Sequence, residues 1–210
     1  MFIVDDDPAV QQALRLSFRS VGYRAEVFAS ATQFLDAYDE QMAGCILLDV
    51  RMPGLSGIEL QEQLNQRHSI LPIIFMTGHG DVPMAVTAMQ AGALDFIQKP
   101  FNEQELIDRV TQALNRDAHN RSVLQEKHEI HKRLESLTPR EREIMEMVVD
   151  GKANKVIAGD LQLSQRTVEI HRARVMEKML ATSLAHLVRM VIAVDESDAG
   201  DLGVTKLTRA

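Results

Sequence analysis

The run Cys45-Ile46-Leu47-Leu48-Asp49 is an apolar stretch that ends in a carboxylate, and the turn-forming residues Met52-Pro53-Gly54 follow it closely. Short apolar runs of this kind are typical of strands in a parallel sheet that is covered on both faces. Two similar runs occur at 2–4 and 73–76. We therefore expect a parallel sheet in which Asp49 follows a buried strand.

The pattern repeats on both sides of this run as strand followed by helix. The predicted strands are Phe2–Val4, Arg24–Phe28, Cys45–Leu48, Ile73–Met76 and Asp95–Gln98. The helical patterns between and after them are Pro8–Val21, Thr32–Tyr38, Gly57–Arg67, Pro83–Ala91 and Glu103–Asn115. This alternation predicts a doubly wound α/β domain with a five-stranded parallel sheet over residues 1–116.

The rest of the chain has a different pattern. Residues 117–137 are polar and mixed in charge, which predicts a helical linker that extends the preceding helix. From Thr138 the pattern is purely helical, and Thr138-Pro139 with Glu141 forms the sequence of a capping box. We expect an all-α domain of four helices at 138–194 and a disordered tail at 195–210.

Composition excludes several classes of protein. The 210 residues are 45% hydrophobic and 25% charged, which argues against a collagen-like or disordered chain. No apolar run approaches the roughly 18 residues of a membrane helix, and the N-terminus does not read as a secretory signal. A single cysteine, Cys45, excludes an intrachain disulfide and a multi-cysteine metal site. We expect a cytoplasmic protein.

Charge is distributed unevenly along the chain. Residues 1–116 contain 8 Lys and Arg against 15 Asp and Glu, whereas residues 138–194 contain 9 against 7. An acidic front and a mildly basic rear suggest two modules with different partners.

Polar side chains follow four of the predicted strands. They are Asp5, Asp6 and Asp7 after the first, Asp49 after the third, Thr77 after the fourth and Lys99 after the fifth. The carboxyl ends of parallel strands border the crevice where ligands bind. Clustered carboxylates repel one another unless a cation shares the site, and hard oxygen ligands suit Mg²⁺. An aspartate beside Mg²⁺ and a lysine is placed as a nucleophile towards a phosphoryl group.

Each of these residues also has a simpler interpretation. Three aspartates before Pro8 could mark a helix N-terminus, and Asp49 could be a loop residue. Thr77-Gly78 could form a turn, and Lys99 could be a solvated loop residue. Their joint occurrence at strand ends favours a site.

Four motifs resemble the receiver domain of two-component response regulators: Ile3-Val4-Asp5-Asp6, Leu47-Leu48-Asp49-Val50-Arg51-Met52-Pro53, Thr77-Gly78-His79-Gly80-Asp81 and Lys99-Pro100-Phe101. The resemblance implies that Asp49 is the phosphoacceptor. It implies that Asp5, Asp6, Asp49 and the carbonyl of Arg51 hold Mg²⁺. Lys99 would contact the phosphoryl oxygens, Thr77 would hydrogen-bond the phosphoryl group and Phe96 would be the aromatic switch residue. Lys99–Pro100 would be a cis peptide, and Asp7 a third acidic residue of lesser consequence.

The rear domain contains a helix, a tight turn and a second helix. Ile157, Ala158 and Leu161 are expected to face inward with Val168, Val175 and Met179. A basic ridge remains outside, suited to a DNA major groove and its phosphates, and consists of Lys155, Arg166, His171, Arg172, Arg174 and Lys178. Charge spacing alone leaves open a solvated amphipathic helix.

Leu137-Thr138-Pro139-Arg140-Glu141, Asn154-Lys155 and Thr167-Val168-Glu169-Ile170-His171-Arg172 resemble the LuxR-type helix-turn-helix. With the front domain, the chain resembles the FixJ branch of the NarL/FixJ response regulators. Base-edge contacts would fall on Glu169, Ile170 and Ala173. Phosphate contacts would fall on Lys155, Thr167, His171 and Arg174, and Asn154, Arg166, Arg172 and Lys178 complete the expected DNA-binding set. Glu169 could accept from a cytosine amino group.

The resemblance implies a transcription factor switched by a sensor histidine kinase, and not an enzyme beyond its own Mg²⁺-dependent phosphorylation and dephosphorylation. Expected partners are the kinase, double-stranded operator DNA, RNA polymerase and a second copy after phosphorylation, with no membrane. A haloacid dehalogenase-like phosphohydrolase is disfavoured because position 51 is Arg rather than a second Asp. An RNA-binding antiterminator would lack the Thr167–His171 motif.

Other conspicuous residues have simpler interpretations. We expect His79 to position its loop and Cys45 to be a small core residue. Met145, Met147, Met176 and Met179 recur at helical spacing and are expected in the core.

Overall fold

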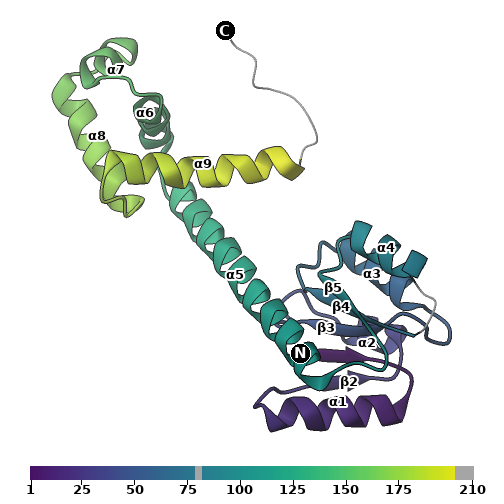
Figure 1. Ribbon diagram of the computed structural model, residues 1–210. Coiled ribbons are helices and arrows are strands. Elements are labelled where there is room, and N and C mark those ends of the chain that lie inside the picture. The colour runs from purple at the N-terminus through teal and green to yellow at the C-terminus, as the bar shows by residue number, and fades with distance from the viewer. Residues whose placement is uncertain (79–81, 202–210) are drawn as a thin grey trace. The chain divides into compact units, whose positions relative to one another are not determined.

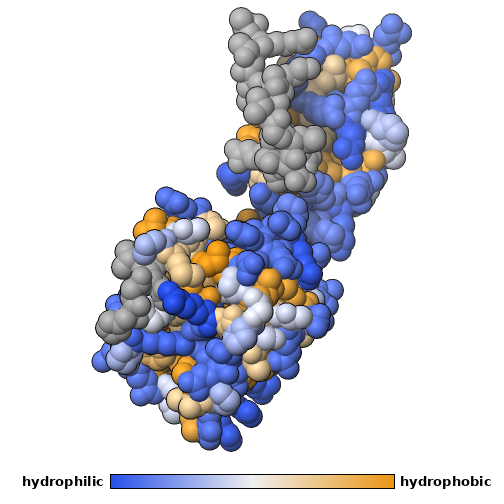
Figure 2. Space-filling view, turned by 90° about the vertical axis from the view of Figure 1, so that its right-hand side faces the viewer, coloured by the Kyte–Doolittle hydropathy of each residue, from blue (hydrophilic) through white to orange (hydrophobic). Residues whose placement is uncertain are grey.

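The computed structural model describes residues 1–78 and 82–201, and the side chains of 1–78 and 83–194. The chain forms two compact units, Met1–Ser122 and Val123–Ala210, and each is described by itself. No helix of the described residues has the length and apolar character to cross a membrane. On the face drawn in Figure 2, hydrophilic residues predominate and hydrophobic ones lie in small groups between them.

The first unit is built on a five-stranded sheet (Figure 1). The strands are β1 (Phe2–Val4), β2 (Glu26–Phe28), β3 (Ile46–Asp49), β4 (Ile73–Thr77) and β5 (Asp95–Gln98). They lie in the order β2-β1-β3-β4-β5, and every neighbouring pair is parallel. The doubly wound α/β fold expected from the sequence is confirmed.

Alternate residues of each strand pack on opposite faces of the sheet, as the period of a β-strand requires. Val4, Leu48 and Phe75 pack towards α2 (Ala31–Ala37), α3 (Gly57–Gln66) and α4 (Val82–Gln90). Ile3, Leu47 and Ile74 pack towards α1 (Pro8–Ser20) and α5 (Glu103–Glu135). Cys45 is fully buried in this second core, as expected. Helices cover both faces of the sheet, which leaves the ends of the strands uncovered.

Helix α5 continues without a break through the predicted linker to Glu135. Its residue Asp117 is 3% exposed and accepts hydrogen bonds from the Gly44 amide (2.8 Å) and from Arg121 Nε (3.0 Å). Arg121 also donates to the carbonyl of Met42. These contacts explain why the first compact unit reaches Ser122, beyond the boundary at 116 that the sequence suggested.

The second unit consists of the end of α5 with α6 (Pro139–Val149), α7 (Asn154–Asp160), α8 (Gln165–Lys178) and α9 (Leu184–Asp201). The capping box at Thr138 and Glu141 is present at the start of α6. All four methionines expected in the core pack there: Met145 and Met179 are buried, and Met147 and Met176 are partly buried.

Helix α9 continues to Asp201, whereas the sequence pattern placed the start of the tail at residue 195. Residues 202–210 lie outside the described part of the chain.

Candidate functional site

Three charged side chains meet at the carboxyl ends of β1, β3 and β5. Nζ of Lys99 lies 2.6 Å from Oδ1 of Asp49 and 2.7 Å from Oδ2 of Asp5. Asp5 is fully buried, and Asp49 is 8% exposed. The parallel order β1-β3-β4-β5 brings these residues to one edge although 94 positions separate Asp5 from Lys99.

Backbone amides hold the second oxygen of each carboxylate. Oδ2 of Asp49 accepts from the amide of Arg51 (2.8 Å), and Oδ1 of Asp5 accepts from the amide of Asp7 (2.9 Å). Asp7 is itself the N-cap of α1 and accepts from the amide of Ala9 at 2.8 Å. Asp6 is exposed. The acidic triplet therefore serves both interpretations: Asp7 caps a helix, and Asp5 lies in the charged cluster.

The cluster shifts the titration of two of its members. Burial raises the pKa of the Asp49 carboxyl, although the hydrogen bond and the charge of Lys99 act in the opposite direction. Burial lowers the pKa of Lys99, but its hydrogen bonds to Asp49 and Asp5, together with their charges, outweigh burial and leave the pKa raised. The Lys99 ammonium is therefore held in its charged form.

Thr77 and Phe96 lie on the neighbouring strands. Thr77 ends β4 and is 4% exposed, and its carbonyl accepts from the amide of Lys99 at 2.7 Å. Phe96 lies on β5 and is 40% exposed. The cis peptide expected at Lys99–Pro100 is confirmed. His79, for which a loop-positioning role is expected, lies outside the described residues.

The donor set at this edge fits a magnesium ion. Within the described residues, no three Asp, Glu, His or Cys side chains gather closely enough to hold a metal by themselves. Mg²⁺ does not need such a cage, because proteins bind it through one or two carboxylates, with waters and phosphate oxygens as the other ligands. Asp5 and Asp49 converge on one cationic nitrogen, so their oxygens already face a point of positive charge.

Gly57 shapes the site and had no functional role in the sequence analysis. A Cβ at this position would lie 2.2 Å from the carbonyl oxygen of Asp49 and 3.1 Å from Cγ of Leu48. The start of α3 therefore approaches strand β3 at a distance that only glycine permits. The sequence offered one sign of this role, because Gly57 stands between a predicted turn and the start of a predicted helix.

The second unit presents a helix-turn-helix. Helix α7 is followed by a turn in which Gln162 has φ 55°, and α8 begins after Ser164, which caps it by accepting from the amide of Thr167 (3.0 Å). The side chains expected inside are there: Ile157, Ala158, Val168, Val175 and Met179 are buried, and Leu161 is partly buried. On the other side of α8, Glu169, Ala173 and Arg174 are exposed, and Ile170 is 46% exposed.

The expected DNA-binding cations fall into two groups. Lys155, Arg166 and Arg174 are exposed, and none forms an ion pair with another described residue. Arg172 instead donates to Oδ1 of Asn154 at 2.5 Å and so ties α8 to the start of α7. Lys178 donates to Glu141 (2.6 Å) and to the carbonyl of Ser136 (3.0 Å). Thr167 and His171 are partly buried, and Nδ1 of His171 is buried without a hydrogen-bond partner.

Lys178 therefore has a structural connection that the sequence did not indicate. Its partner Glu141 is 3% exposed and also accepts from the amide of Thr138 at 2.9 Å. The pKa of Glu141 is lowered to about 2 by the hydrogen bond from Lys178 and then by the Thr138 amide. This geometry favours packing of α8 on α6 as the role of Lys178.

Comparison with known protein families matches both units. Residues 1–111 match the response regulator receiver domain. Residues 135–191 match the bacterial regulatory proteins of the luxR family.

Similar proteins share this organisation over nearly the whole chain. The transcriptional regulatory protein FixJ of Azorhizobium caulinodans is 46% identical and covers 95% of this chain and 94% of its own. Nodulation protein W of Bradyrhizobium diazoefficiens is 44% identical over 90% of this chain and 84% of its own. Among solved structures, the response regulator StyR is 44% identical with a TM-score of 0.84 and covers 91% of this chain and 96% of its own.

Proposed function

The chain belongs to the NarL/FixJ family of response regulators, and on that basis we propose that a sensor histidine kinase phosphorylates it at Asp49. It is a transcriptional regulator with a receiver and a LuxR-type DNA-binding domain, not an enzyme of the usual kind. We assign the receiver to the first compact unit and DNA binding to 138–194, joined by the helical linker. Such a protein would act in the cytoplasm, where its DNA is.

The bridge from Lys99 to Asp49 carries the proposal. Burial raises the pKa of Asp49, which means that its ionised form is unfavourable unless a cation lies beside it. Lys99 is that cation. Asp49 contacts it and ends the central strand β3. Asp5 also contacts Lys99, but it is fully buried.

The expected chemistry is a phosphoryl transfer between nitrogen and oxygen. An oxygen of Asp49 attacks the phosphorus of a phosphohistidine, and the P–N bond breaks as the new O–P bond forms. The imidazole nitrogen keeps the bonding electrons and takes a proton. Lys99 would then contact the phosphoryl oxygens, and Thr77 would donate its hydroxyl hydrogen to them. With acetyl phosphate as donor, a P–O bond would break instead and acetate would leave with the bonding electrons. Water would later cleave the acyl phosphate of Asp49, which restores the carboxylate and releases inorganic phosphate.

Receiver domains generally use Mg²⁺ for this reaction. Here Asp5, Asp6 and Asp49, with the carbonyl of Arg51, would hold the ion. When bound, it would neutralise charge on the phosphoryl oxygens. Asp6 is exposed, so its carboxylate would be free to turn towards the ion.

Switching would pass from the phosphoryl group to the exposed face of the receiver. Thr77 is joined to the strand of Phe96 through the Lys99 amide and through its register with Gln98. Phe96 is exposed and could turn inward if Thr77 moves towards Asp49. We propose that the face formed by α4, β5 and α5 then pairs with the same face of a second copy.

Paired receivers would place two copies of α8 on a two-fold operator. Glu169, Ile170 and Ala173 are exposed on α8, as contacts with base edges require, and Ile170 could meet a thymine methyl group. Lys155, Arg166 and Arg174 are the cations available for phosphates, and Thr167 and His171 would assist. Contact with RNA polymerase would follow from promoter binding.

The proposal is tested by labelling with acetyl phosphate in the presence of Mg²⁺. The parent protein should gain one phosphoryl group, and Asp49→Asn should gain none while keeping its fold by circular dichroism. Asp36→Asn, which makes the same change at an exposed position of α2, should label like the parent. Equal labelling of the Asp49 variant and the parent would refute the assignment of the phosphoacceptor.

A further inference from the structure

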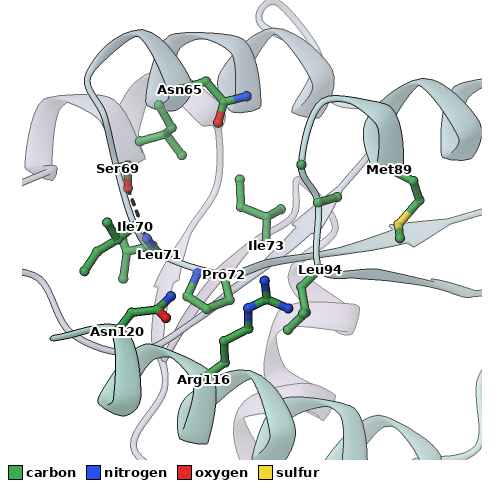
Figure 3. Close-up of a pocket in the computed structure, with 13 residues that line it drawn as sticks. Asn65, Ser69, Ile70, Leu71, Pro72, Ile73, Met89, Leu94, Arg116 and Asn120 are labelled. Atoms are coloured by element: carbon green, nitrogen blue, oxygen red, sulfur yellow. Dashed lines mark hydrogen bonds between the residues drawn. The ribbon is translucent and has the colours of Figure 1, made fainter. Parts of the chain in front are cut away.

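A cavity of about 400 Å³ lies in the first unit at the amino ends of β4 and β5, the sheet edge opposite to Asp49 (Figure 3). Its walls come from the end of α3, the loop 69–72, the segment from Met89 to Leu94, and α5. This volume lies within the usual range for small-molecule sites. The phosphorylation chemistry does not use this cavity.

Arg116 gives the cavity its charge. Figure 3 shows its guanidinium rising from α5 towards Pro72 and Leu94. Among the described residues Arg116 forms no ion pair, and no residue that lines the cavity is acidic. The adjacent carboxylate, that of Asp117, is already engaged by Gly44 and Arg121. Arg116 is exposed, so the cavity offers one solvent-accessible cation that no described residue pairs with.

Neutral polar groups flank this cation. Asn120 lies one turn after Arg116 on α5. Across the cavity, Nδ2 of Asn65 donates to the carbonyl of Ala91 at 2.8 Å, so this amide is fixed and presents its oxygen. Oγ of Ser69 accepts from the amide of Leu71 at 3.4 Å, which leaves its hydroxyl hydrogen to donate. These groups could orient a ligand without competing for its charge.

The rest of the lining is apolar. Leu71, Ile73 and Ala93 are between 5% and 7% exposed and form the floor, with Pro72 and Leu94 beside them. A lone guanidinium beside aliphatic side chains matches a ligand with one carboxylate, which it can bind through two parallel hydrogen bonds, and a short apolar body. A phosphate dianion would need further positive charge that the cavity does not provide.

We propose that this cavity binds a small aliphatic monocarboxylate, with its carboxylate on Arg116 and its hydrocarbon part against Ile73 and Leu94. The site would be separate from the phosphoacceptor and would add a second chemical input to the receiver.

The test uses the full-length chain, with hexanoate, 1-hexanol and inorganic phosphate as probes. Methyl NMR of Ile73, Met89 and Leu94 reports binding at the cavity. Hexanoate should shift these signals saturably, 1-hexanol should bind more weakly because it lacks the charge, and phosphate should leave the signals unchanged. Equal affinity for hexanoate and phosphate would reduce the site to an adventitious ion only.

Three variants separate specific binding from general attraction of anions. Arg116→Gln should weaken hexanoate binding about tenfold. Asn120→Asp should also weaken it, because the new carboxylate lies four residues from Arg116 and can pair with it. Arg15→Gln removes the same charge from an exposed position of α1 and should leave the affinity unchanged. Absence of saturable shifts in the parent, or equal losses in the Arg15 and Arg116 variants, would overturn the proposal.

Discussion

The ammonium of Lys99 lies 2.6 Å from a carboxylate oxygen of Asp49, and this ion pair joins the ends of β3 and β5. The same nitrogen holds the buried Asp5 at 2.7 Å. Two ionised carboxylates beside one ammonium leave a net negative charge at the site, and this charge favours binding of an additional divalent cation.

Replacement of Lys99 by Met should destabilise the receiver by about 1–3 kcal/mol, because two buried carboxylates lose their partner. Added Mg²⁺ should restore part of the loss, since an ion that binds only the folded state stabilises it. Urea unfolding with Mg²⁺ and with a chelator measures both effects. Lys132→Met, at an exposed ion pair of α5, should change little. A Lys99 variant as stable as the parent in chelator would contradict this prediction.

Gly57→Ala should destabilise the chain by about 1–3 kcal/mol, because the added methyl group overlaps the Asp49 carbonyl and must push α3 away from β3. Gly159→Ala provides the matched control, since a Cβ there meets nothing within 4 Å and the residue lies inside α7. The control should stabilise the protein by about 0.5–1 kcal/mol through helix propensity. Thermal unfolding measures the stability of both variants. Equal changes would contradict the prediction, because they would show that the backbone around Gly57 makes room for a methyl group at little cost.

Glu141 should make the free energy of unfolding of the second unit depend on pH in the acidic range. Its pKa in the folded protein is about 2 against an ordinary value of 4.5, so its contribution is complete above pH 4.5 and is lost as the pH falls towards 2. Lys178→Met should reduce this dependence and cost about 1 kcal/mol at neutral pH, because the lysine is partly exposed.

Lys152→Met, which breaks the more exposed pair with Asp160, serves as the control for this acid dependence. It should leave the slope of stability against pH between 4.5 and 2 unchanged. Unfolding monitored at several pH values gives the slope. An identical slope in the parent and the Lys178 variant would show that this ion pair does not set the titration of Glu141.

Arg174→Ala should weaken binding to operator and random DNA alike and reduce the slope of log affinity against log salt by about 0.9, the amount expected for one phosphate contact. The residue is exposed on α8 and has no ion pair among the described residues. Lys178→Ala should reduce the slope less, because its ammonium is held by Glu141 and Ser136. Fluorescence anisotropy over a salt series measures all three proteins.

Glu169→Lys should act on sequence preference instead. It replaces an acceptor with a donor at a position expected to face base edges. Selection from a random DNA library should yield a different preferred site for this variant, whereas Arg174→Ala should select the parental site. An unchanged preference in the Glu169 variant would place this side chain away from the bases.

Much of the fold followed from local patterns. Apolar runs at 2–4, 45–48 and 73–76 predicted buried parallel strands, and parallel strands necessarily bring their carboxyl ends to one edge. The meeting of Asp5, Asp49 and Lys99 was therefore foreseeable without coordinates. The capping box at Thr138 was foreseeable for a similar reason, since it depends on residues three positions apart.

Tertiary structure alone decided which charges are engaged. Helical spacing placed Lys178, Arg172 and Arg174 on one ridge, but the carboxylate that holds Lys178 comes from Glu141, 37 positions away. The same limit applied to Asp117, which caps the Gly44 amide across 73 positions, and to Gly57, whose need for glycine comes from a carbonyl on another element. Periodicity predicts which face of a helix or strand a side chain occupies. Its partner depends on how separate elements pack against each other, and a local sequence pattern contains no information on that packing.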